Sequence, residues 1–308
     1  MARRKAQHDS DIQRADKLKR LTVVALVSDD DLLDRLVLKG GNAMGLTGEV
    51  SVRQSIDVDF SIDGDIAELG SLEEIRELME RLLVETFREE GYEVFDVTLE
   101  RQPPNLQDDV LGGFWGGYKL AFKVLDAATF KLLDLEETRR RQAIVVAPGV
   151  RRTFTVDLSK HECCGEKVLR RVGNHNVYVY SERMLVCEKI RAICQQMPEY
   201  REIVKSQSAK PRARDFFDIH HMITNYDVDV STDEFWYTLT GMFRAKKVPL
   251  SLLGRISKHR EFHRDDFGSV RDTVAVSIKL REFDFYVNFL VERLALLEAR
   301  WEVEPPSL

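Results

Sequence analysis

Long apolar runs are missing from this sequence. No stretch approaches the roughly 20 consecutive apolar residues that a membrane-spanning helix needs. The first residues, MARRKAQHDSDIQ, are charged and lack the apolar core of a secretory signal peptide. Internal repeats and low-complexity segments are also absent, so a repeat architecture is not indicated. These absences lead us to expect a cytoplasmic protein.

Cysteine is scarce and is not arranged for metal binding. The four cysteines form no C-x-x-C motif: they are Cys163, Cys164, Cys187 and Cys194. Structural zinc sites usually show two spaced pairs of ligands. This chain has one unspaced pair near His161 and His175, which leaves zinc as the lesser alternative to buried free thiols. The pattern is typical of a reducing compartment.

An excess of basic residues is missing as well. The chain has 46 Lys and Arg against 52 Asp and Glu, a net charge of −6. This balance argues against a surface coated with basic residues for DNA, although local basic clusters leave room for a basic groove. The 308 residues, 44% hydrophobic and 32% charged, indicate a soluble globular protein of about two domains. A chain of this length can bury a hydrophobic core large enough to fold without stabilising disulfide bonds.

The secondary-structure pattern divides the chain into three parts. Residues 1–35 read as helix, broken near residues 28–30. Residues 36–177 alternate strands with one long amphipathic helix, SLEEIRELMERLLVETFREEG, which begins at a serine cap and ends at a glycine. Residues 178–308 are almost entirely helical, and the polar stretch PEYREIVKSQSAKPRA among them is expected to be mobile. We therefore expect an N-terminal helical segment, a mixed α+β domain and a helical C-terminal domain.

Two aspartates in the segment SIDVDFSI are the first candidates for chemistry. Asp57 and Asp59 are two residues apart on a predicted strand, so their side chains point to the same face. Two neighbouring carboxylates repel each other, and a cation between them removes the repulsion. Mg²⁺ suits this position because it takes oxygen ligands from one or two carboxylates together with substrate phosphates. The alternative is a solvated edge strand.

Two glycines precede these acids. Gly40 and Gly41 follow an apolar run and come before a short predicted helix, so the backbone there can approach a phosphate closely. A tight turn without a ligand is the alternative. Arg53 and Ser55 continue the i, i+2 spacing of Asp57 and could contact phosphate from the same face, or they could be ordinary surface residues of the strand.

Further charged residues could complete a phosphoryl-transfer site. A third carboxylate is often needed to hold two metal ions. Asp157 in FTVDLSK is the favoured candidate, Asp96 in YEVFDVTL competes with it, and either could instead be a structural acid paired with an arginine. In the helical half, Lys189 could neutralise a triphosphate. Alternatively or additionally, it could form an inter-helix ion pair with Asp215 or Asp218, which lie on one helical face.

Taken in order, these motifs resemble a known family. The chain contains K-G-G-x-x-M, R-x-S-x-D-V-D-F, FWGGYKLAFKV, E-K-I-x-A and R-D-F-F-D between residues 36 and 225. This series resembles the AbiEii/AbiGii-type nucleotidyltransferases, the toxins of bacterial abortive-infection and toxin–antitoxin systems that act in phage defence. The family often has leucine where this chain has Met44. The resemblance implies a DNA polymerase β-like nucleotidyltransferase domain followed by a helical domain.

The resemblance also implies roles for individual residues. Gly40 and Gly41 would cradle the phosphates of an NTP, with Arg53 and Ser55 nearby. Asp57 and Asp59 would ligate Mg²⁺, for which Mn²⁺ is an alternative. Lys189, which would also contact the nucleotide, and Asp215 would complete the site from the helical half, with Asp218 as the alternate acid. The family partner is a separate antitoxin with a winged-helix DNA-binding domain.

The reaction implied by the resemblance is transfer of NMP from an NTP to RNA, in some members to the 3′ end of tRNA. An RNA acceptor needs a basic rim, because phosphate contacts dominate its affinity. The candidates for this rim are Arg139–Arg141, Arg151, Arg152 and Lys205–Arg214. Two other functions stay open: a catalytically silent relative that binds protein or RNA, and a nucleotidyltransferase that modifies a protein hydroxyl or a small molecule.

Overall fold

One mixed β-sheet forms the centre of the structure. The computed structural model describes residues 2–41, 43, 58–104, 113–146, 151–205, 208–274 and 278–301. In these residues the sheet has seven strands in the order β3-β4-β5-β2-β1-β7-β6. The strands are β1 (Leu36–Lys39), β2 (Val58–Ile62), β3 (Tyr92–Gln102), β4 (Gly117–Asp126), β5 (Phe154–Ser159), β6 (Val168–Val172) and β7 (His175–Val179).

The middle of the sheet contains the parallel pairings. β2 runs parallel to β5 and β1 runs parallel to β7, whereas β1 and β2 are antiparallel to each other. The outer strands extend the sheet as antiparallel pairs, β3 with β4 and β6 with β7. All four residues of β1 are buried, which is typical of a central strand covered on both faces.

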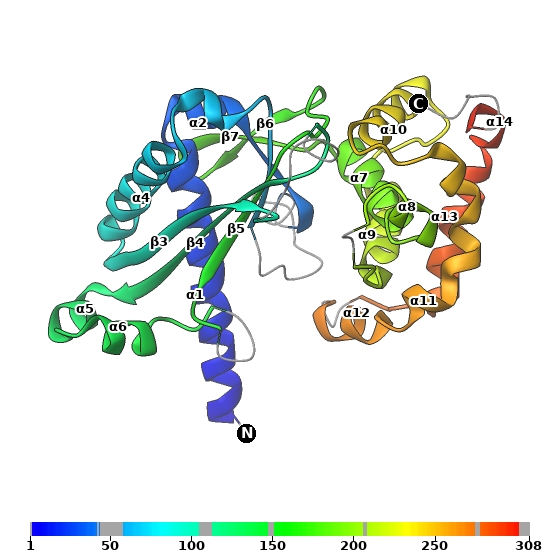
Figure 1. The fold of residues 1–308 in the computed structure, drawn as a ribbon. Helices are drawn as coiled ribbons and strands as arrows, with labels where there is room; N and C mark the ends of the chain where they lie inside the picture. The colour runs from blue at the N-terminus through cyan, green and yellow to red at the C-terminus, as the bar shows by residue number, and fades with distance from the viewer. Residues whose placement is uncertain are drawn as a thin grey trace.

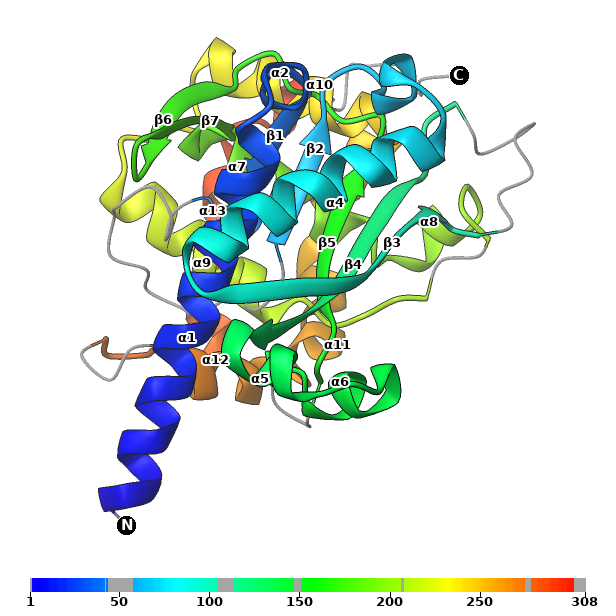
Figure 2. The ribbon, with the colours of Figure 1, turned by 90° about the vertical axis from the view of Figure 1, so that its left-hand side faces the viewer.

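Helices α1 (Ala2–Val27) and α4 (Leu72–Glu89) cover one face of the sheet, the face toward the viewer in Figure 2. Helix α4 begins at the Ser71 cap that the sequence predicts, and in the structure Glu74 completes a capping box with it. The buried residues of α4 recur every fourth position: they are Ile75, Met79, Leu83 and Phe87. Burial of each contributes about 1.5–3 kcal/mol. Two short elements, α2 (Asp30–Arg35) and the 3₁₀ helix η1 (Ile66–Leu69), lie at the same end of the sheet.

The helical half lies beyond the opposite face of the sheet (Figure 1). Two short helices, α5 (Ala127–Leu132) and α6 (Glu136–Gln142), still belong to the strand-rich half. Helix α7 (Glu182–Cys194) is buried on almost all sides and packs against α9 (Ala213–Asn225) and α10 (Asp233–Ala245). The other helices are α8 (Pro198–Arg201), the 3₁₀ helix η2 (Leu250–His259), α11 (Arg260–Arg264), α12 (Phe267–Thr273), α13 (Phe283–Ala295) and α14 (Glu298–Trp301).

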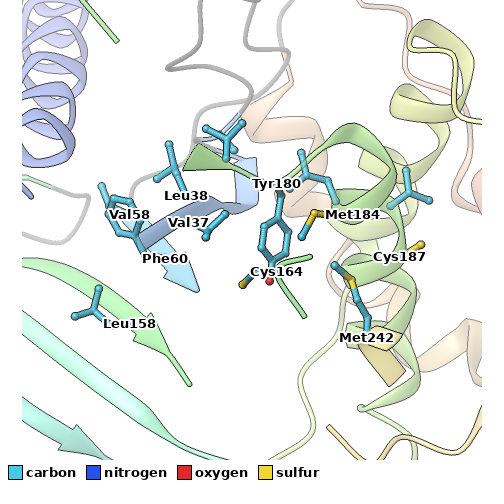
Figure 3. Close-up of a cluster of buried hydrophobic side chains, with 14 of the residues drawn as sticks. Val37, Leu38, Val58, Phe60, Leu158, Cys164, Tyr180, Met184, Cys187 and Met242 are labelled. Atoms are coloured by element: carbon cyan, nitrogen blue, oxygen red, sulfur yellow. The ribbon is translucent and has the colours of Figure 1, made fainter. Parts of the chain in front are cut away.

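The sheet and the helical half share one apolar core. Figure 3 shows Tyr180 between the strand residues Leu38 and Phe60 and the helix residue Met184. The Tyr180 hydroxyl lies 2.6 Å from Ser61 Oγ, which provides the buried phenol with its hydrogen-bond partner. The core is therefore continuous across the point where the chain changes from strands to helices.

The α+β fold expected from the sequence is confirmed. In the described residues the last strand ends at Val179 and α7 begins at Glu182, close to the change expected near residue 178. Whether the two halves behave as separate domains stays a prediction. The first residues of the stretch expected to be mobile are held in place, because α8 places Tyr200 in the interior, where its hydroxyl donates to the carbonyl of Lys246. No helix in the described part of the chain is long and apolar enough to cross a membrane.

Candidate active site

Four charged residues form a row across the middle of the sheet. Lys39 of β1 lies opposite Asp59 of β2, and Asp59 lies opposite Asp157 of β5. Asp157 in turn lies opposite Lys119 of β4, whose Nζ is 3.7 Å from Asp157 Oδ1. Residues paired directly across neighbouring strands point to the same face of a sheet. The register therefore places two carboxylates side by side, with a lysine on each flank.

A cavity of about 500 Å³ lies over three of these four residues; Lys119 is not among its described lining residues. Its floor includes Lys39, Asp59 and Asp157. Its far wall comes from Glu188 and Arg191 of α7 and from Gln195 directly after that helix. The remaining described residues of the lining come from the ends of β3, β4 and β5, from the loops beside them and from the helical half: Gln102, Pro103, Trp115, Gly116, Gly117, Tyr118, Leu158, Ser159, Glu162, Ala192, Arg212 and Lys246. The volume is in the range of small-molecule and cofactor sites.

Two glycines shape this region. Gly40, directly after β1, has φ +71°, and a Cβ there would lie 3.1 Å from Asp59 Oδ2. A Cβ on Gly117 would lie 2.1 Å from the carbonyl oxygen of Leu158, so only glycine allows β4 to approach β5 at the rim of the cavity. The lack of a side chain at Gly40 thus leaves room for the Asp59 carboxylate. Neither Gly40 nor Gly41 is among the described residues that line the cavity.

The structure brings together two of the predicted acids. Asp59 and Asp157 both line the cavity from adjacent parallel strands. Asp57, Arg53 and Ser55 lie outside the described residues, so their predicted roles stay predictions. No group of three His, Cys, Asp or Glu side chains able to hold a metal occurs in the described part of the chain. The carboxylates of Asp59 and Asp157 nevertheless offer the oxygen ligands that Mg²⁺ or Mn²⁺ prefers.

Asp96, the competing third carboxylate, lies elsewhere. It occupies an irregular position in β3 with φ +53°, and it is not among the described residues of the cavity lining. Its carboxylate accepts hydrogen bonds from Arg140 at 2.7 Å and Lys123 at 2.8 Å. The Arg140 bond in particular, against a smaller effect of burial, holds the pKa of Asp96 below its usual value. The structural-acid alternative therefore describes Asp96.

Lys189 forms the inter-helix ion pairs expected from the sequence. Its ammonium lies 3.0 Å from Asp215 and 2.8 Å from Asp218, joining α7 to α9. Burial favours the neutral amine, but the two carboxylates outweigh it and raise the pKa of Lys189. The second Asp215 oxygen lies 3.4 Å from Arg212 Nη1, without hydrogen-bond geometry. Of this group only Arg212 is among the described lining residues, and the catalytic roles predicted for Lys189, Asp215 and Asp218 stay predictions.

The sequence analysis did not identify a second charged cluster, centred on Glu162. This carboxylate follows β5 and is 5% exposed, and it lies 3.3 Å from each of Lys39, Arg191 and Lys246. Burial raises a carboxyl pKa, but the three cations outweigh it and lower the pKa of Glu162 to about 2. Only the positions of these residues in space reveal the cluster, because they come from four separate segments of the chain.

The cysteines are free thiols, as the sequence predicts. Cys164, Cys187 and Cys194 are buried, and burial raises the pKa of each of them above the usual range. A buried thiol with a raised pKa is a poor nucleophile and a poor metal ligand. The cysteines therefore contribute to packing, and the zinc alternative has no support in the described residues.

The chain as a whole is similar to one protein-family model and to solved structures. The family model described as "Nucleotidyl transferase AbiEii toxin, Type IV TA system" matches residues 23–289. Among solved structures, MenT4, a nucleotidyltransferase toxin of Mycobacterium tuberculosis H37Rv, is similar with 18% identity and a TM-score of 0.49, covering 94% of this chain and 87% of its own. An antigenic nucleotidyltransferase-like protein from Paracoccidioides brasiliensis gives 14% identity, a TM-score of 0.36 and coverage of 77% and 92%. No curated protein matches the sequence.

Proposed function

The chain belongs to the AbiEii family of nucleotidyl transferase toxins of type IV toxin–antitoxin systems, and we propose that its cavity transfers NMP from an NTP to the 3′ end of tRNA. The observation that carries this proposal is the pair of carboxylates, Asp59 and Asp157, in register beneath the cavity. An acceptor hydroxyl attacks the α-phosphorus, the bond from that phosphorus to the bridging oxygen breaks, and pyrophosphate leaves with the electron pair. The hydroxyl proton passes to solvent.

The two carboxylates fit a divalent cation. They come from adjacent strands, they are paired directly across the sheet, and their repulsion is relieved by a positive charge between them. A bound Mg²⁺ or Mn²⁺ ion would supply charge stabilisation at the transferring phosphoryl group. Asp57, two residues before Asp59, is the further ligand that we propose. Gly40 stabilises this arrangement because a side chain at its position would displace the Asp59 carboxylate.

The acceptor is proposed to enter past Arg212, the one member of the predicted basic rim among the described lining residues. Arg212 lies 3.4 Å from Asp215 and still lines the cavity, whereas the three arginines of α6 are paired with nearby groups and are not among the described lining residues. Arg140 is bound to Asp96, Arg141 contacts Glu137, and Arg139 stacks over the ring of Phe130. A basic approach to the cavity would therefore depend on the segment that contains Arg212 rather than on α6. We also propose the family's cognate antitoxin, with a winged-helix DNA-binding domain, as the protein partner.

The test uses the full chain, Mg²⁺, total tRNA and each α-³²P-labelled NTP in turn. Asp59→Asn and Asp157→Asn are the site variants, and Asp96→Asn is the matched control, because it removes a carboxylate outside the cavity. We expect label on tRNA with the wild type and the control and a loss of at least about 100-fold with either site variant. Label on protein would refute the RNA acceptor, and equal labelling by all variants would refute the assignment of the site. Absence of label with every NTP and acceptor would favour a silent binding protein.

A further inference from the structure

Three cations from distant segments converge on one buried carboxylate at the cavity wall. Lys39 ends β1, Arg191 is in the last turn of α7, and Lys246 directly follows α10. Each lies 3.3 Å from an oxygen of Glu162, and all four side chains are at least 90% buried. All four also line the cavity. The protein therefore concentrates positive charge at one end of the carboxylate row, beside Asp59.

Three carboxylates lie around these three cations. Glu162 faces all three, Glu188 lies 3.4 Å from Arg191, and Asp59 lies opposite Lys39 in the sheet. Removing a charge from water costs several kcal/mol, so the buried cations need carboxylates of this kind. A divalent cation on Asp59, as proposed above, would leave one positive charge of the cluster unbalanced at the wall of the cavity. An anion bound in that cavity would supply the missing negative charge.

The cations also retain unused hydrogen-bond donors. Lys39 contacts Ser159 Oγ and Glu162, and Lys246 contacts the carbonyl of Lys160 and Glu162. Each ammonium has three N–H groups, so within the described residues each has one left. The Nε of Arg191 is buried and has no hydrogen-bond partner among the described residues. By contrast, the ammonium of Lys189 is held by two carboxylates and is not among the described lining residues.

From this arrangement we propose that Lys39, Arg191 and Lys246 form the polyphosphate subsite of the cavity, with Glu162 as the positioning residue that gathers them. The proposal rests on the proposed nucleotidyl transfer and specifies which cations hold the triphosphate and the pyrophosphate product. Lys39 lies opposite Asp59 in the register, so a polyphosphate on this cluster has one end beside the carboxylate pair. That is where the α-phosphate must lie if Asp59 and Asp157 take part in the reaction.

The first test measures binding of inorganic tripolyphosphate to the full chain by calorimetry, without acceptor or nucleotide. Loss of one charge-assisted contact to a phosphate weakens binding by about 10- to 100-fold. We expect this loss for Lys246→Met and for Arg191→Met. Lys247→Met is the matched control: its ammonium lies over the ring of Phe114 and contributes nothing to the cluster, so its affinity is expected to stay within about twofold of the wild type.

The second test separates a binding role from a structural one by pH. Burial lowers the pKa of Lys246 to about 8, because the nearby Arg191 and Lys39 reinforce the effect and Glu162 offsets only part of it. Its other neighbours in the described residues are the carbonyl of Lys160, to which the ammonium donates at 2.6 Å, and the Trp115 ring 5.8 Å away. The ammonium is present below this pKa and is lost above it, so tripolyphosphate affinity is expected to fall as the pH rises through about 8. Lys246→Arg keeps its charge and is expected to remove that fall.

The outcomes distinguish this proposal from the function on which it rests. Transfer of nucleotide with an unchanged KM for NTP and unchanged tripolyphosphate affinity in folded Lys246→Met and Arg191→Met would overturn the subsite and leave the function standing. Tight tripolyphosphate binding that depends on these residues, without transfer to any acceptor, would support the subsite and remove the function. If both methionine variants fail to fold, as circular dichroism would show, the pH profile of Lys246→Arg decides: a fall identical to that of the wild type refutes the subsite.

Discussion

Replacing Glu162 with glutamine removes the only negative charge that Lys39 and Lys246 contact in the described structure. The side chain keeps its size, so the change is electrostatic. Loss of one partner from a buried ion pair destabilises a protein by about 3–5 kcal/mol, because the remaining charges stay buried without compensation. The lowered pKa leads to a similar magnitude: a fall from the usual 4.5 to about 2 corresponds to about 3 kcal/mol.

The two figures agree, and urea unfolding of Glu162→Gln at pH 7 tests them. Glu199→Gln is the matched control, because its ion pair with Arg255 is partly exposed, at 35% and 47%, and an exposed pair contributes about 0–1 kcal/mol. If the thermal midpoint is also followed, a loss of about 3–5 kcal/mol should lower it by about 6–10 °C in a chain of this size.

The pH dependence of the same variant provides a further check. The pKa of Glu162 is depressed in the folded state, so its stabilisation is complete above the unfolded value near 4.5 and is lost as the pH falls from there toward 2. The difference between wild type and Glu162→Gln is therefore expected to shrink over that range. A difference below about 0.5 kcal/mol at pH 7, or one that does not change in acid, would refute the reasoning.

Three further predictions concern single residues. Asp59→Asn and Asp157→Asn are each expected to lower kcat by about 100-fold or more without a comparable change in Tm, whereas Asp96→Asn should leave kcat within about twofold; steady-state labelling of tRNA measures this. Lys189→Met leaves two carboxylates of α9 buried against α7 without the ammonium they share, so urea unfolding should show a loss of about 3–5 kcal/mol, and a neutral result would contradict the buried ion pairs. Gly40→Ala places a Cβ 3.1 Å from Asp59 at positive φ, at a cost of about 1–2 kcal/mol, and labelling should fall further than for Gly64→Ala, which also has positive φ but has nothing within 4 Å.

Local patterns made part of the site predictable. The alternation in SIDVDFSI and in FTVDLSK placed Asp59 and Asp157 on strands, and the pairing of β2 with β5 then brought them together. Capping and spacing were sufficient for α4, since Ser71, Glu74 and the buried apolar residues of its inner face all lie within one segment. Features of this kind depend on residues that are close together in the sequence, so they can be predicted from the sequence alone.

The Glu162 cluster was not predictable because its members are far apart in the sequence and each looks ordinary. Helix α7 is buried on nearly all sides, so hydrophobic periodicity does not indicate which of its charged residues faces the cavity. The sequence indicated Lys189 on this helix and gave no indication of Arg191, which is the one of the two among the described lining residues. Asp96 shows the converse case: an irregular position in β3 turns it toward Lys123 and Arg140, and no sequence signal marks that irregularity.

The continuous core around Tyr180 limits how far the two sides of the cavity can move relative to each other. Packed interiors resist compression and do not slide without exposing apolar surface, and here that interior extends from β1 and β2 through Tyr180 to Met184 on α7. The floor and the far wall of the cavity are therefore set at a fixed spacing before any substrate arrives. We expect the cavity to select its substrate by fit to a preformed site rather than by closing around it.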